Sequence, residues 1–160
     1  MNYKIIDNFL QKDVLISFQN LLMSTTLPWY WRENMTKDDN FFFNYCFYNN
    51  HAPQSVFFNE FITPMLIKLK CNAPVEVRAN LMLKKNICYN SNFHIDKNFN
   101  CKTAIFYVNT NNGYTILDKI KKIRIDSIEN RMLIFDSKIL HAAFSQTDTE
   151  RRIVVNFNYF

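Results

Sequence analysis

Apolar and polar residues alternate along much of the second half of this sequence, which is the pattern of half-buried β-strands. The clearest case is residues 75–85. One face of this segment would carry Val77, Ala79, Leu81 and Leu83, and the other Arg78, Asn80, Met82 and Lys84. We expect the first face to pack in the core and the second to face a cavity or solvent.

Further short strands are expected between polar turns, at residues 103–109, 114–117, 119–125, 131–135 and 151–160. Asn111-Asn112-Gly113 has the chemistry of a tight turn, so we expect residues 103–109 and 114–117 to pair as a hairpin. The basic residues of the next segment are assigned to the solvated side of a strand. They are Lys119, Lys121, Lys122 and Arg124.

A helical period marks two segments of the first half. Apolar residues recur at helical spacing from Val14 to Leu22, with Asp13 as the predicted N-cap. Residues 55–69 repeat the pattern, and Pro64 should kink or restart that helix. Aromatic residues are crowded over residues 27–48, which we interpret as a strand and an aromatic-rich wall of the core. Alternatively, residues 29–40, which lack a clear period, form a substrate-covering loop.

This order of elements predicts a mainly β fold with packing helices around a jelly-roll, or double-stranded β-helix, core. The 160 residues fit a single domain, residues 1–160, with helical support at about 1–72 and the jelly-roll core at about 73–160. The hydrophobic content of 48% and charged content of 21% are near the globular average, which argues against disorder.

Composition also limits partners and location. A net charge of +5 is mildly basic, so nucleic-acid binding is permitted but not indicated. The cysteines lack CxxC spacing and the N-terminus lacks a secretory pattern, so we expect reduced thiols and a cytoplasmic location. No apolar run approaches the ~20 residues of a membrane span. The single glycine and abundant Asn, Phe and Lys are typical of an AT-rich genome, viral or bacterial.

The candidate chemistry begins at Phe93-His94-Ile95-Asp96. On an extended backbone His94 and Asp96 would point to the same side. Imidazole and carboxylate suit iron(II), and a distant second histidine would complete a two-His-one-carboxylate face. His141, after a predicted strand and turn, is the candidate third ligand at a barrel mouth. The alternative is that these are ordinary polar groups, the role assigned to His51.

Arg152, in the last predicted strand, is a candidate carboxylate-binding group. It shares a face with Val154, Asn156 and Asn158, while its neighbour Arg151 points the other way. If that face lines the cavity, the guanidinium can bind a carboxylate through two hydrogen bonds. The alternative is a surface charge at a strand end.

The order of HxD, strand, distal His and C-terminal Arg resembles the iron(II)- and 2-oxoglutarate-dependent dioxygenases, and within them the prolyl-hydroxylase-like group. The resemblance covers residues 75–160 and, more loosely, the leading strand and helix. Residues 103–109 resemble the strand after the HxD in that group, and residues 151–160 resemble its last strand.

The resemblance implies that His94, Asp96 and His141 hold iron(II), and that Arg152 and Tyr107 bind the far carboxylate of 2-oxoglutarate. It implies hydroxylation of a C–H bond, in a prolyl or other peptide residue, with dioxygen (O2) as oxidant, succinate and CO2 as coproducts and ascorbate as a reductant. Candidate substrate contacts on the presumed cavity faces are Arg78, Asn80 and Asn158. Met82 stands where the group usually has an aromatic residue, and Tyr114 replaces the second glycine of a common pair.

Two alternatives to a peptide hydroxylase remain open. One is a catalytically silent jelly-roll binding protein. The other is the same chemistry on a small molecule or an alkylated nucleic-acid base. The base is disfavoured, because Arg151 and Arg152 are adjacent rather than spaced and no basic, aromatic-interleaved channel is evident. A peptide or protein is therefore the expected partner, and the sequence does not determine the oligomeric state.

Overall fold

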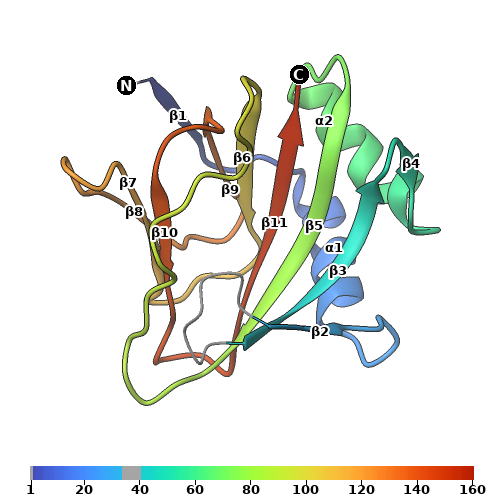
Figure 1. Ribbon diagram of the computed structural model, residues 1–160. Coiled ribbons are helices and arrows are strands. Elements are labelled where there is room, and N and C mark those ends of the chain that lie inside the picture. The colour runs from blue at the N-terminus through green and yellow to red at the C-terminus, as the bar shows by residue number, and fades with distance from the viewer. Residues whose placement is uncertain (1, 34–40) are drawn as a thin grey trace.

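The protein, described by a computed structural model over residues 2–33 and 41–160, is built on two antiparallel β-sheets. In the larger sheet the strand order is β1-β9-β6-β11-β5-β3-β2, and β4 pairs with β3. The smaller sheet has the order β10-β7-β8 and lies beside the larger one (Figure 1). This arrangement confirms the predicted mainly β jelly-roll fold with packing helices.

The strands of the larger sheet come from both halves of the chain. They are β1 (Tyr3–Ile6), β2 (Tyr30–Glu33), β3 (Phe41–Asn49), β4 (Ala52–Pro53), β5 (Pro74–Leu83), β6 (Lys102–Tyr107), β9 (Arg131–Asp136) and β11 (Arg151–Tyr159). The smaller sheet consists of β7 (Tyr114–Leu117), β8 (Ile123–Asp126) and β10 (His141–Phe144). The first 72 residues thus supply strands to the main sheet as well as its helical cover.

The helices cover one face of the larger sheet and leave the other face toward the smaller sheet (Figure 1). α1 (Lys12–Met23) places Phe18 against Phe61 and Phe106, with ring centroids 5.0 and 6.3 Å apart. α2 (Thr63–Lys68) follows a π-helical turn, η1 (Phe58–Ile62). Pro64 lies at the start of α2, where its missing N–H costs nothing, so the predicted restart is confirmed.

The predicted faces of β5 are largely confirmed. Val77, Ala79 and Leu81 are buried in the helix-covered core. Leu83 was also assigned to the core and is exposed, because β5 ends there, beyond the cover of the helices.

The predicted hairpin between residues 103–109 and 114–117 is wrong. β6 pairs with β9 on one side and β11 on the other, so neither of its edges is free for β7. The chain crosses to the second sheet at Asn111, whose side chain accepts a hydrogen bond from the Gly113 N–H at 3.0 Å. β7 then pairs with β8 and β10.

Two local assignments also differ from the prediction. The segment at Lys119–Lys122 is a turn rather than a strand, because the Asp118 carboxylate accepts hydrogen bonds from the N–H groups of Ile120 and Lys121. α1 is preceded by Gln11, so Asp13 lies in its first turn and is not the N-cap. The strand interpretation of residues 27–48 is confirmed by β2 at Tyr30–Glu33 and β3 at Phe41–Asn49, and residues 34–40 of the alternative loop lie outside the described residues.

All four cysteines carry free thiols. Among the described residues, no helix is both long and apolar enough to cross a membrane.

Candidate functional site

His94, Asp96 and His141 meet at one end of the space between the two sheets. His94 and Asp96 lie on the long loop between β5 and β6, and His141 is the first residue of β10. The extended backbone assumed for residues 94–96 is limited to an isolated β-bridge at His94. Two isolated antiparallel bridges to β10 hold the loop, one at Asn90 and Phe144 and one at His94 and His141, the latter with N–H···O hydrogen bonds of 3.0 and 2.9 Å.

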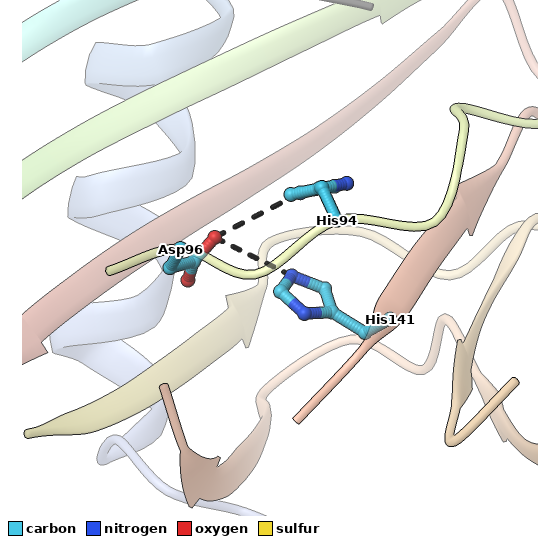
Figure 2. A group of neighbouring side chains, drawn as sticks. All are labelled: His94, Asp96 and His141. Atoms are coloured by element: carbon cyan, nitrogen blue, oxygen red, sulfur yellow. Dashed lines mark ion pairs between the residues drawn. The ribbon is translucent and has the colours of Figure 1, made fainter. Parts of the chain in front are cut away.

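One point in space is surrounded by three donor atoms (Figure 2). Oδ1 of Asp96 lies 3.4 Å from Nε2 of His141 and 3.8 Å from Nε2 of His94. The potential ligand atoms of the three residues all lie within 4.8 Å of one another. Neighbouring ligands of one metal ion with bonds of ~2.1 Å are about 3 Å apart, so a small contraction would suffice to hold an ion.

The hydrogen bonds of both imidazoles leave Nε2 free for a metal. Nδ1 of His94 lies 2.9 Å from the Asn92 carbonyl oxygen, and Nδ1 of His141 lies 3.0 Å from that of Ile139. A carbonyl only accepts, so each Nδ1 carries a hydrogen, and in the neutral ring each Nε2 presents its lone pair to the cluster. Backbone hydrogen bonds of this kind orient metal-binding histidines in general.

Burial and charge act on the cluster in opposite directions. Burial raises the pKa of Asp96, but the hydrogen bond and charge of His141 outweigh it, so the pKa of this carboxyl lies well below its usual range. Burial lowers the pKa of His141, and the Asp96 carboxylate overcomes this and raises it. Burial, followed by the charge of His141, lowers the pKa of His94. Asp96 is therefore a carboxylate at neutral pH, as a metal ligand must be.

A cavity of about 480 Å³ extends from the two histidines between the sheets. Its wall is mostly apolar, through side chains such as Ile105, Val154 and Phe42. Arg152 lies at the other end, 1% exposed, so the sequence-predicted arginine faces the cavity. A cavity of this size and lining is typical of small-molecule sites.

Arg152 is a buried cation that the described residues do not neutralise. Its Nε donates to Ser127 Oγ at 3.2 Å and its Nη1 to Met82 Sδ at 3.4 Å, both neutral acceptors. Burial lowers the pKa of the guanidinium, which nevertheless stays charged at neutral pH. Buried charges are normally paired, so this one is suited to an anionic ligand.

Tyr107 and Gly113 lie close to Arg152. Burial raises the pKa of Tyr107, so its hydroxyl keeps its proton, which it donates to Thr115 Oγ1 at 2.8 Å. Thr115, not Tyr107, is the member of this pair that lines the cavity. A Cβ on Gly113 would lie 2.9 Å from Cδ of Arg152, so the one glycine of the chain leaves room for the arginine.

The three predicted substrate contacts have different positions. Asn80 lines the cavity, as its alternation predicted. Arg78 forms an ion pair with Glu76, and among the described residues it is not one that lines the cavity. Asn158 donates hydrogen bonds to Asp96 and Thr103 instead of facing the cavity.

Several residues around the site carried no signal in the sequence. Thr103, Thr115 and Ser127 are common polar residues, and only their partners, Asp96, Tyr107 and Arg152, reveal their positions. Asn156 could be placed on the cavity face of β11 by alternation, and its Oδ1 is buried without a hydrogen-bond partner.

The fold is shared with solved oxygenase structures. A prolyl hydroxylase from Trichoplax adhaerens, in complex with a peptide fragment of the hypoxia inducible factor oxygen degradation domain, matches with a TM-score of 0.71 and 16% identity, over 99% of this chain and 83% of that one. A Pseudomonas putida prolyl-4-hydroxylase matches with a TM-score of 0.68 and 10% identity, over 98% and 91%. HygX from Streptomyces hygroscopicus, with nickel and 2-oxoglutarate bound, matches with a TM-score of 0.65 and 13% identity, over 98% and 82%.

No family model matches the sequence, and no curated protein matches it. The structural likeness is therefore one of fold, at identities between 10% and 16%. The chain has the jelly-roll fold of the prolyl hydroxylases and other 2-oxoglutarate- and iron(II)-dependent oxygenases.

Proposed function

We propose that the protein is an iron(II)- and 2-oxoglutarate-dependent hydroxylase. The observation that carries this proposal is the presence of two complementary half-sites in one cavity. At one end three donors converge, with two neutral imidazole nitrogens and one carboxylate oxygen, the ligand set typical of non-haem iron(II) oxygenases. At the other end Arg152 offers a buried, unneutralised guanidinium to a carboxylate.

Different residues would bind the iron and the cosubstrate. His94, Asp96 and His141 would hold the iron and leave its remaining positions toward the cavity. Arg152 would bind the far carboxylate of 2-oxoglutarate, and Thr115, with Tyr107 behind it, lies ready to add a hydroxyl contact. The apolar wall around Ile105 and Val154 would exclude water from the bound cosubstrate.

When bound, iron(II) with 2-oxoglutarate and dioxygen supplies a two-electron oxidation that places one oxygen atom in a C–H bond and releases succinate and CO2. The protein contributes position and shelter, since the oxidising chemistry belongs to the cofactor. A reductant such as ascorbate would keep the metal in its iron(II) state.

The proposed substrate is a residue of a peptide or protein, prolyl among the candidates. Two of the solved structures with this fold are prolyl hydroxylases, and the one from Trichoplax adhaerens holds a peptide. Exposed apolar side chains lie on or next to the loop at the cavity, including Leu83, Tyr89 and Ile95, and could contact such a chain. We propose a cytoplasmic location, with which the free thiols agree.

The first prediction concerns His94. The purified protein with iron(II) and 2-oxoglutarate should form succinate. His94→Ala should reduce the rate of succinate formation at least ~100-fold, because only two of the three proposed iron ligands remain. Succinate is measured by mass spectrometry. His51→Ala is the matched control, since His51 is exposed and outside the cluster. Full turnover in His94→Ala would contradict the metal assignment.

The substrate class has its own experiment. Peptide pools incubated with enzyme, iron(II), ascorbate and 2-oxoglutarate are searched by mass spectrometry for products that gain one oxygen atom. Oxidised peptides that form with wild type and not with His94→Ala support the peptide assignment. Succinate formation without any oxidised peptide would direct the search to small molecules.

A further inference from the structure

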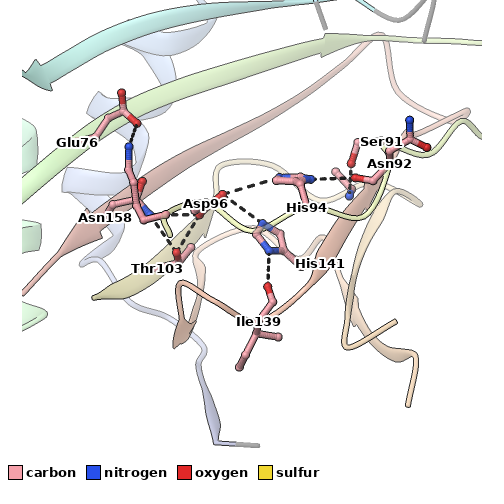
Figure 3. A network of polar contacts seen from close by, with 11 residues as sticks. Glu76, Ser91, Asn92, His94, Asp96, Thr103, Ile139, His141 and Asn158 are labelled. Carbon is pink, nitrogen blue, oxygen red and sulfur yellow. Dashed lines mark hydrogen bonds and ion pairs between the residues drawn. The ribbon is translucent and has the colours of Figure 1, made fainter. Parts of the chain in front are cut away.

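The two oxygens of the Asp96 carboxylate have separate partners (Figure 3). Oδ1 faces the two histidines at 3.4 and 3.8 Å. Oδ2 points away from them and accepts hydrogen bonds from Thr103 Oγ1 at 2.8 Å and from Asn158 Nδ2 at 3.2 Å. Each oxygen therefore has a distinct chemical environment even without a metal.

Thr103 and Asn158 are themselves held in one arrangement. They lie opposite each other on β6 and β11, neighbouring strands at the centre of the larger sheet, and are 0% and 5% exposed. Asn158 Nδ2 also donates to Thr103 Oγ1 at 2.9 Å. The threonine hydroxyl accepts from the amide, so its single hydrogen is free to go to Asp96. The two rigid strands thereby fix a carboxylate that belongs to a loop.

We infer that Thr103 and Asn158 are positioning residues for Asp96, which occupy Oδ2 so that Oδ1 alone is presented to the metal. The inference rests on the proposed function, in which Asp96 is a ligand. A carboxylate with two free oxygens can bind a metal through both, and would then occupy a position needed by cosubstrate or oxygen. Buried neutral donors on Oδ2 prevent this and preorganise the site before the metal arrives.

Strand β11 then has a role at both ends of the cavity. Asn158 fixes the metal ligand at one end, and Arg152, six residues earlier on the same face, offers the anion site at the other. The distance between the half-sites is thus set by one continuous strand.

The second prediction tests this role with cobalt(II), which reports coordination by its visible spectrum without turnover. Thr103→Val removes the hydroxyl and keeps the shape, and Asn158→Ala removes the amide. Each should weaken cobalt(II) binding by roughly 10–100-fold, as loss of such hydrogen bonds to a metal ligand does. The ligand-field band should also change in intensity as Oδ2 becomes free to coordinate. Thr103→Ser retains the hydroxyl and should restore both affinity and spectrum.

Controls separate the possible outcomes. Thr110→Val makes the same chemical change at an exposed loop position and should bind cobalt(II) as wild type does. Wild-type affinity and spectrum in both Thr103→Val and Asn158→Ala would overturn the inference and leave the proposed function standing. Absence of cobalt(II) binding in wild type, or equal binding in His94→Ala, would instead overturn the proposed function. If Thr103→Val does not fold, Asn158→Ala alone decides.

Discussion

Arg152 is the residue at which stability and the proposed function conflict. A guanidinium that is 1% exposed and has only neutral hydrogen-bond partners among the described residues has lost most of its hydration without gaining a counter-ion. Such a group destabilises the ligand-free protein and binds an anion strongly for the same reason. We therefore expect the cavity to favour a ligand that carries an anionic group at the Arg152 end.

The third prediction follows from that conflict. Arg152→Met should raise the KM for 2-oxoglutarate roughly 10–100-fold, because charged hydrogen bonds of about 1.5–3 kcal/mol are lost. The ligand-free variant should be at least as stable as wild type, since the buried charge is gone. Steady-state kinetics and urea unfolding measure the two effects. Arg151→Met is the matched control, because Arg151 is the exposed neighbour on the opposite face.

An unchanged KM in Arg152→Met, or an equal rise in Arg151→Met, would show that the anion binds elsewhere. A large loss of stability in Arg152→Met would show that the guanidinium is satisfied in the ligand-free protein.

Residue type and order in the sequence were enough to identify the groups with distinctive chemistry. His94, Asp96, His141 and Arg152 were all named from the sequence. The structure brings the first three together, and both histidines line the same cavity as Arg152. Thr103 could not be found in this way. Its contact with Asp96 depends on the register of β6 against β11, and a threonine in a strand has no feature that reveals its partner.

At the scale of elements, the sequence predicted what depends on local pattern and missed what depends on pairing. Alternation located β5, β9 and β11, and helical period located α1. The predicted pairing of β7 with β6 was wrong, since β7 pairs with β8 and β10. A turn signal shows that the chain reverses, but not which strand edges are already occupied. Strand β1 likewise has no sequence feature that predicts its place beside β9 at the edge of the sheet.

The fourth prediction concerns how β1 is attached at that edge. The Asp7 carboxylate accepts two hydrogen bonds from Arg131 of β9, at 2.6 and 3.1 Å, and the pKa of Asp7 is lowered from its ordinary 3.8 by this contact. A lowered pKa means that the contribution to stability is present above pH 3.8 and is lost as the pH falls through the lower value. The Asp7 side chain is 53% exposed, so solvent screens the pair and its contribution should be only ~0.2–1 kcal/mol.

Asp7→Asn should therefore lower the free energy of unfolding at neutral pH, and its difference from wild type should shrink at acid pH. Urea titrations across this range measure it. The double variant Asp7→Asn/Arg131→Gln should lose little more than either single variant, because both remove the same contact. A difference that persists unchanged at low pH would contradict the pairing.

At the scale of the whole molecule, the site is assembled from both sheets and from a long loop. His141 begins β10 of the smaller sheet, Arg152 belongs to β11 of the larger sheet, and Asp96 lies on the loop that joins β5 to β6. The cavity wall likewise includes residues of both sheets, such as Asn80 and Ala143. A metal ion and a cosubstrate that bind at its two ends would therefore join the sheets across the cavity.

The fifth prediction is that ligands should stabilise the whole fold cooperatively. Cobalt(II) and 2-oxoglutarate together, without oxygen, should raise the Tm by more than the sum of their separate shifts. A ligand at ~100 times its Kd contributes about 2.7 kcal/mol, which corresponds to about 5–11 °C for a domain of this length. Arg152→Met should keep the cobalt(II) shift and lose the part due to 2-oxoglutarate, while Asp96→Ala should lose both. Differential scanning fluorimetry measures these shifts. If 2-oxoglutarate raised the Tm equally with and without metal, the three-donor cluster and Arg152 would bind their ligands independently. That result would contradict the proposal that one cosubstrate contacts both ends of the cavity.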